Sequence, residues 1–199
     1  MKIIYIKHIL SFVLIASLSQ FISSENEPFK STYFPMPYSN VLFQNANIFD
    51  GDGNKFLDTD LIIQDGKIVA IGKDLPKSKD IKVIDATNKW ITPGIIDIHS
   101  HMGVYPAPSV RTSSDGNEST SPVTADVWAE HSIWVQDPQF ALALKGGVTT
   151  FHVLPGSANL IGGRGVTAKN VQRNTINSMK FPEAPHSLKM GCGDNAKRG

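Results

Sequence analysis

Two histidines one residue apart, His99 and His101, end the apolar stretch ITPGIIDIHSHMG at residues 91–103. Alternate side chains of a β-strand project to one face, so both imidazoles are expected on the same side, with Asp97 below them. A catalytic zinc centre takes three protein ligands and a water, and imidazole is a common ligand. The pair therefore predicts part of a metal centre, with Asp97 either orienting a ligand or bonding within the fold. A coincidental His-x-His pair is the alternative, and the buried-type strand before it favours the metal site.

Composition narrows the class of protein. The chain has 199 residues, a formal net charge of +1 and 41% hydrophobic residues, which is typical of a soluble globular protein of one or two domains. This near-neutral charge gives no electrostatic basis for a nucleic-acid or anionic-membrane partner. The single cysteine, Cys192, excludes an intrachain disulfide and a Cys2His2 zinc finger.

The first residues predict secretion. Lys2 and Lys7 precede an apolar run over residues 9–22, and small and polar residues follow. This order is typical of a signal peptide, predicted over residues 1–24, and the run is short of the roughly 20 apolar residues of a bilayer span. We expect a secreted or extracytoplasmic protein with no membrane attachment after cleavage; an uncleaved signal anchor is the alternative. Asn117 begins an Asn-Glu-Ser sequon and is a candidate glycosylation site.

Residues 25–92 predict a small β-sheet or part of a sandwich. Short apolar runs alternate with turns from residue 40 onward, and Asp-Gly pairs at 52–53 and 65–66 are hairpin signals. The segment LIIQDGKIVAIG, at residues 61–72, is predicted to form one such hairpin.

From Pro93 the pattern changes to strand, helix, strand. IIDIH, at residues 95–99, is apolar enough for a strand buried on both faces. A helix is predicted after Asp137, with Gly146 at its end, and the β-branched run VTTFHV follows it. This order is typical of a parallel α/β sheet. The Gly-rich GGRG at 162–165 predicts a tight turn or an anion-binding loop.

Several motifs together resemble the amidohydrolase superfamily, in particular its imidazolonepropionase-like group. They are DGKIVAIG, VIDATNKWITPGIIDIHSH, GGVTTFHVLPGSANLIGGRGVTAKN and LKMGCGDNAKRG, the last with Asp194 and Ala196 where the group has Glu and Pro. The resemblance covers residues 40–199. It implies an α/β fold in which residues 25–92 are the N-terminal part of a composite β-sandwich. Residues 93–199 would then form the first strands of a (β/α)8 TIM barrel.

The resemblance also implies a chemistry. One or two divalent metals, with zinc the expected ion, would be held by His99 and His101. Lys189 falls near the place of a lysine that is often carboxylated and bridges two metals; an ordinary surface lysine is the alternative. Metal-activated water would then hydrolyse a C–N bond in a small-molecule amide, a cyclic amide or an N-acylated amino acid. The later histidines and the catalytic aspartate of strand 8 are not expected within these residues, so the catalytic residues stay unknown.

Length limits this expectation. A (β/α)8 barrel contains about 250 residues, and residues 93–199 are fewer than half of that. We therefore expect an incomplete barrel that is inactive by itself. The alternative is a non-catalytic secreted remnant that binds a metal or a partner. A homo-oligomer would be one way to cover its open strand edges.

Overall fold

The computed structural model describes residues 30–198. The predicted signal peptide at residues 1–24 lies outside them, as do the first residues of the predicted sandwich segment. Within the described part of the chain, no helix is long and apolar enough to cross a membrane.

The first sheet is built around β1 (Val41–Phe49), in the order β3-β2-β1-β4, with β5 pairing the far end of β1. β1–β2 and β2–β3 are antiparallel, whereas β4 and β5 run parallel to β1. The predicted hairpin is confirmed as β2–β3, in which Asp65 and Gly66 turn the chain with φ of 50° and 73°. The other strands are β2 (Lys55–Gln64), β3 (Lys67–Gly72), β4 (Lys82–Asp85) and β5 (Trp90–Ile91). A small apolar cluster packs on this sheet: Ala46, Ile48, Leu61 and Ala86.

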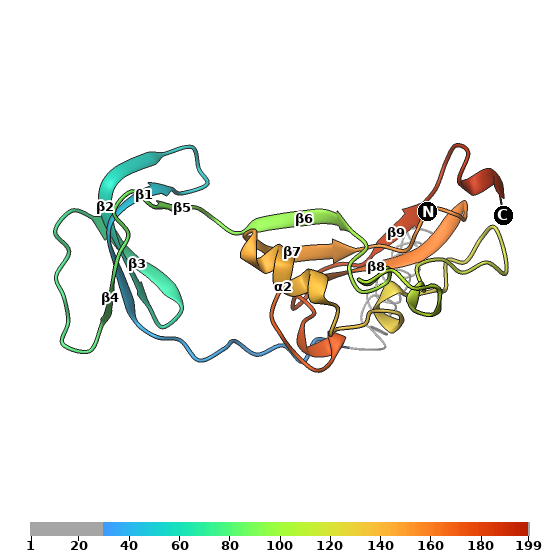
Figure 1. The fold of residues 1–199 in the computed structure, drawn as a ribbon, viewed down its shortest axis with the longest axis horizontal. Helices are drawn as coiled ribbons and strands as arrows, with labels where there is room; N and C mark the ends of the chain where they lie inside the picture. The colour runs from blue at the N-terminus through green and yellow to red at the C-terminus, as the bar shows by residue number, and fades with distance from the viewer. Residues whose placement is uncertain (1–29, 199) are drawn as a thin grey trace, which may run out of the picture. The chain divides into compact units, whose positions relative to one another are not determined.

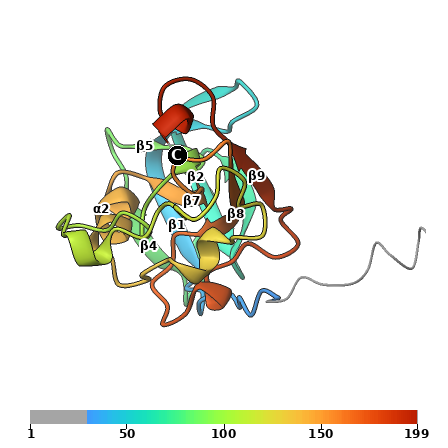
Figure 2. The same ribbon diagram turned by 90° about the vertical axis from the view of Figure 1, so that its right-hand side faces the viewer.

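The second sheet has the order β6-β7-β8-β9 (Figure 1). β6 and β7 are parallel and are connected through α2, as the strand–helix–strand pattern predicted. β8 is antiparallel to both of its neighbours, and the turned view shows β7, β8 and β9 together (Figure 2). The elements are β6 (Ile95–Ser100), α2 (Pro138–Lys145), β7 (Val148–Val153), β8 (Ile161–Lys169) and β9 (Ser187–Met190). The core on this sheet consists of Val104, Ala129, Phe140, Phe151, Val153, Val166, Ala168 and Met179.

Helix α2 forms where the sequence predicted it. The Asp137 carboxylate accepts a hydrogen bond from the Gln139 backbone at 3.0 Å, Pro138 occupies the first turn, and the helix ends before Gly146. Asp137 also accepts the backbone N–H of Gly103 at 2.9 Å. The helix start therefore holds the loop that follows β6, and this loop begins at the predicted metal ligand His101.

Two local predictions are wrong. The strand at residues 95–99 is not buried on both faces, because Ile96 and Ile98 are 63% and 77% exposed. The reason is that β6 packs mainly against its neighbour β7 among the described elements, so no further layer covers these side chains. The Gly-rich segment at 162–165 is neither a tight turn nor an anion-binding loop. It lies inside β8, with Arg164 stacked over the Trp128 ring at 4.8 Å.

The wider architecture agrees with the prediction in part. In the second sheet one pair of strands is parallel and joined by a helix, and the other pairs are antiparallel. Within residues 30–198, α2 is the only α-helix. The two mixed sheets fit an N-terminal portion of the expected fold. The (β/α)8 barrel and the composite sandwich stay predictions, as does the domain boundary at residues 92–93.

Candidate metal centre

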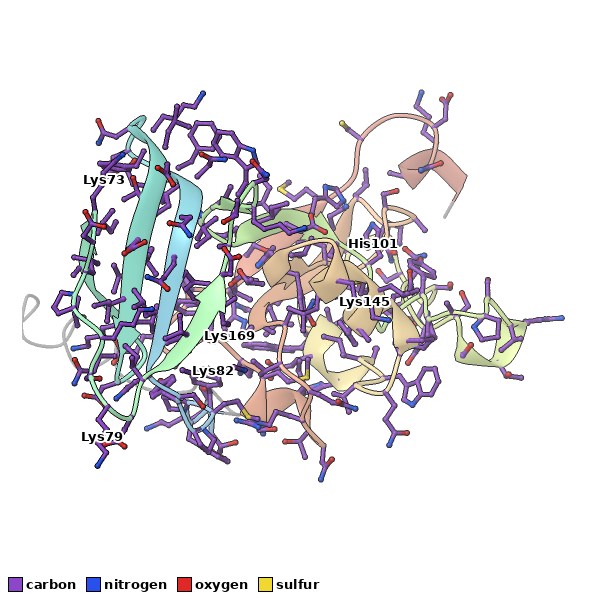
Figure 3. All side chains as sticks on the ribbon, turned by 60° about the vertical axis from the view of Figure 1, so that its left-hand side comes forward. Lys73, Lys79, Lys82, His101, Lys145 and Lys169 are labelled. Carbon is purple, nitrogen blue, oxygen red and sulfur yellow. The ribbon has the colours of Figure 1, made fainter. Side chains whose placement is uncertain are left out.

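His99 and His101 lie at the carboxyl end of β6, on the same side of the strand as the alternation predicted. Their rings meet edge to face with centroids 5.2 Å apart and planes at 82°. Figure 3 marks His101 just beyond the end of β6. His101 is partly buried and His99 is exposed. The two imidazoles are therefore adjacent and accessible.

The ring of His101 and the backbone of His99 each have a defined hydrogen-bond partner. His101 Nδ1 lies 2.9 Å from the Leu154 carbonyl oxygen, which only accepts, so Nδ1 carries the hydrogen and Nε2 keeps its lone pair. Proteins usually orient a metal-binding histidine through a hydrogen bond that its other ring nitrogen donates, for example to a backbone carbonyl oxygen. Asp97 accepts the backbone N–H of His99 at 3.1 Å. Asp97 thus bonds within the fold, and its carboxylate contacts the main chain of His99.

Lys189 lies beside this pair. Its Nζ is 3.3 Å from His99 Nε2, although 90 residues separate the two in sequence. The lysine lies on β9, opposite Gly163 of β8. Partial burial lowers the pKa of the Lys189 amine from its ordinary value. Lys189 Nζ and His99 Nε2 are within hydrogen-bonding distance of each other.

A hydrogen-bonded cluster supports β9 near the site. His152 Nε2 lies 2.6 Å from the Ser187 hydroxyl, and its Nδ1 lies 2.9 Å from the Thr167 hydroxyl. Both ring nitrogens of this half-buried histidine have partners, as expected of a satisfied core histidine. Burial lowers the pKa of His152, and the nearby imidazoles of His186 and His99 lower it further. Because Ser187 is two residues from Lys189, this cluster helps to fix the strand that carries the lysine.

The side chains at the end of β6 fit a divalent metal in their chemistry. His101 Nε2 holds a lone pair that a metal could accept, and an amine of lowered pKa lies 3.3 Å from His99 Nε2. Within residues 30–198, no three His, Cys, Asp or Glu side chains gather in a group that could hold a metal ion, so this site offers two imidazoles and a lysine. The assignment of His99, His101 and Lys189 as ligands stays a prediction.

Sequence reasoning did not connect Tyr105 and Asn117 with this site. The Tyr105 ring meets His101 edge to face, with centroids 5.6 Å apart. The Asn117 amide nitrogen, where the predicted glycan would be attached, hydrogen-bonds to the Tyr105 hydroxyl. Burial raises the pKa of Tyr105, and the bond from Asn117 opposes this shift. With His101, Ser157 and Asn195, these residues line a hollow of about 350 Å³.

In the sequence, the only feature that relates to the pairing of Tyr105 with Asn117 is the presence of two glycines. A Cβ atom added at Gly116 would clash with the Tyr105 ring, and one at Gly156 would clash with both Tyr105 and Asn117. Two glycines thus make room for the tyrosine. Their place beside it comes from tertiary contacts and could not be read from the sequence.

Comparison with known proteins identifies relatives of this chain. It is 32% identical over 151 residues to the amidohydrolase tasK of Hapsidospora irregularis, a match that covers 70% of this chain and 15% of that protein. It is 30% identical over 116 residues to a dihydroorotase of Bacillus cytotoxicus. An amidohydrolase of Thermotoga maritima has a similar structure, with a TM-score of 0.70 and 38% identity over 79% of this chain. The chain belongs to the amidohydrolase superfamily.

This amidohydrolase-superfamily chain spans only part of its relatives. It covers 40% of the Thermotoga protein, 15% of tasK and 21% of the dihydroorotase. A search against protein-family models gives no match. The relatives therefore support the family of this chain. They do not show the activity of the whole protein.

Proposed function

We propose that this chain supplies metal ligands of a hydrolase that cleaves a C–N bond in a small-molecule amide. His99, His101 and Lys189 would hold the divalent metal, with zinc the expected ion. The observation that carries this proposal is the approach of Lys189 Nζ to 3.3 Å from His99 Nε2, beside the His101 ring. Relatives named amidohydrolase, adenine deaminase and dihydroorotase support hydrolysis at a C–N bond.

The residues of the chain would prepare the site as follows. The Leu154 carbonyl holds His101 in the tautomer whose Nε2 can bind a metal. A lysine ammonium has no lone pair, so Lys189 could act as a ligand only as a neutral amine or after carboxylation. Partial burial favours the neutral amine, which is the form that reacts with carbon dioxide. A bound divalent metal supplies a Lewis acid that activates water at neutral pH.

The described residues would supply metal ligands, and proton transfer to or from the substrate would need a further group. Among residues 30–198 no carboxylate joins His99, His101 and Lys189 in a metal-binding group. Since amide hydrolysis needs a general base and acid within hydrogen-bond reach of the substrate, we expect these residues by themselves to bind metal without turning over amides. Secretion, expected from residues 1–24, remains part of the proposal.

Zinc titration of the purified protein tests the proposal. We expect one high-affinity zinc site by calorimetry, weakened at least about tenfold in His99→Ala, His101→Ala and Lys189→Met. His131→Ala and Lys145→Met are matched controls that remove a histidine and a lysine outside the site. Absence of zinc binding, or equal binding by all the variants, would contradict the proposal. The same zinc-loaded samples, incubated with cyclic and N-acyl amides, would reveal any turnover.

A further inference from the structure

The hydrogen bond between Asn117 and Tyr105 has a fixed direction. Asn117 Oδ1 accepts the backbone N–H of Ala158 at 3.1 Å, and a backbone N–H can only donate. The amide is therefore held with Oδ1 towards Ala158 and Nδ2 towards the Tyr105 hydroxyl. Because Nδ2 only donates, the Tyr105 oxygen is the acceptor in this bond. Its own hydrogen is left to be donated elsewhere.

The position of the tyrosine is also fixed. Its ring packs edge to face on His101, and the Tyr105 backbone oxygen accepts from Gln139 Nε2 at 2.9 Å. A Cβ on Gly116 would clash with the Tyr105 ring, and one on Gly156 would clash with the Tyr105 hydroxyl and the Asn117 amide. The hydroxyl is thus held beside the predicted metal ligand, at the wall of the hollow that Tyr105 shares with His101.

The hollow favours an uncharged polar ligand. Beside the imidazole of His101, its polar side chains are a phenol, a hydroxyl and two carboxamides, from Tyr105, Ser157, Asn117 and Asn195. These groups donate and accept hydrogen bonds without carrying a charge. A neutral amide, with a carbonyl oxygen to accept and an N–H to donate, matches this lining.

We propose that Tyr105 donates its hydroxyl hydrogen to the carbonyl oxygen of a neutral amide bound beside His101. Asn117 is the positioning residue that keeps the hydroxyl in the donor role. This inference rests on the proposed function, because it takes the ligand to be the amide that the enzyme hydrolyses. It narrows the substrate class to uncharged amides and gives Asn117 a role that needs its side chain free of a glycan.

The test uses δ-valerolactam labelled with carbon-13 at its carbonyl, a neutral cyclic amide, titrated into the metal-free protein and followed by NMR. We expect Tyr105→Phe to weaken binding about three- to tenfold, the effect of one lost hydrogen bond. Asn117→Asp should weaken binding equally with the tyrosine in place, because a carboxylate only accepts and would draw the hydroxyl hydrogen to itself. The double variant should bind no more weakly than either single variant, since both changes remove the same bond.

Ser119→Ala is the matched control, because it destroys the sequon and keeps Asn117; it should bind the lactam as the unaltered protein does. The bound carbonyl resonance should also move less in Tyr105→Phe than in the unaltered protein, a readout that a general loosening of the fold would not give. The inference is overturned if the unaltered protein gives no saturable shift of the lactam resonance. It is also overturned if Tyr105→Phe or Asn117→Asp binds the lactam as tightly as the unaltered protein, or if the double variant loses the product of the two single-variant factors in affinity.

Zinc titration of the same samples separates this inference from the proposed function. Normal zinc binding with a failed lactam test would overturn only the role of Tyr105. The expected lactam results without zinc binding would support the Tyr105 donor and overturn the metal centre.

Discussion

A buried ion pair between Glu130 and Lys180 offers the sharpest test of how the second sheet is held together. Lys180 Nζ lies 2.8 Å from Glu130 Oε2, and the two side chains are 3% and 2% exposed. Glu130 lies in the 3-10 helix η2 (Ala129–His131). The backbone of Lys180 pairs with that of Ala168 in β8 through an isolated antiparallel β-bridge. The pair therefore ties the long segment between β6 and α2 to the middle of the sheet.

The structure sets the size of the effect. Two unit charges 2.8 Å apart attract by about 6 kcal/mol at an effective dielectric constant of about 20. The cost of removing both ions from water offsets most of this attraction, so the intact pair contributes little net stability. Removing one partner leaves the other charge buried and uncompensated, which costs about 3–5 kcal/mol. That is a large part of the about 5–15 kcal/mol by which a domain is stable.

Urea unfolding followed by circular dichroism measures this effect. We expect Lys180→Met to lose about 3–5 kcal/mol of unfolding free energy, and the double variant Glu130→Leu with Lys180→Met to recover most of the loss. Lys82→Met, on the exposed side of β4 and labelled in Figure 3, should change stability by no more than about 0.5 kcal/mol. A loss below about 1 kcal/mol in Lys180→Met, or additive losses in the double variant, would refute the reasoning.

Three further outcomes are expected. Asp137→Ala should lose about 2–4 kcal/mol in urea unfolding, because it removes the α2 cap and leaves the N–H groups of Gly103 and Ala107 without their carboxylate acceptor; a loss below about 1 kcal/mol would contradict this. Gly116→Ala should weaken lactam binding in the NMR titration, because the new Cβ meets the Tyr105 ring; unchanged affinity would show that the ring position is unimportant. A chelator should lower the unfolding free energy of the zinc-loaded protein, by about 2.7 kcal/mol if free zinc was at a hundred times its dissociation constant; unchanged stability would count against a folded-state site.

Local features of this fold were predictable because their causes are local. The Asp-Gly turn at 65–66 and the Asp137 cap each act within a few residues of chain. The exposure of β6 was not predictable, because it depends on which elements pack against the strand. The antiparallel course of β8 likewise depends on pairing across the sheet, and its glycines suggested a turn instead.

The candidate site divides in the same way. His99 and His101 share one face of a strand, so their spacing alone places them together. Lys189 was predicted beside them from the resemblance, and its Nζ lies at 3.3 Å from His99 Nε2. Tyr105 and Asn117 were not predicted because no motif marks them. Backbone bonds from Asp115 to the Val104 carbonyl and from Ala158 to Asn117 Oδ1 bring their side chains together.

The central claim is that one metal ion binds where His99 and His101 meet Lys189. X-ray absorption at the zinc edge of the zinc-loaded protein tests it most directly. We expect an inner shell that includes imidazole nitrogens at about 2.0–2.1 Å, lost in the double variant His99→Ala with His101→Ala. An imidazole shell that persists unchanged in that variant would contradict the claim and place the metal elsewhere.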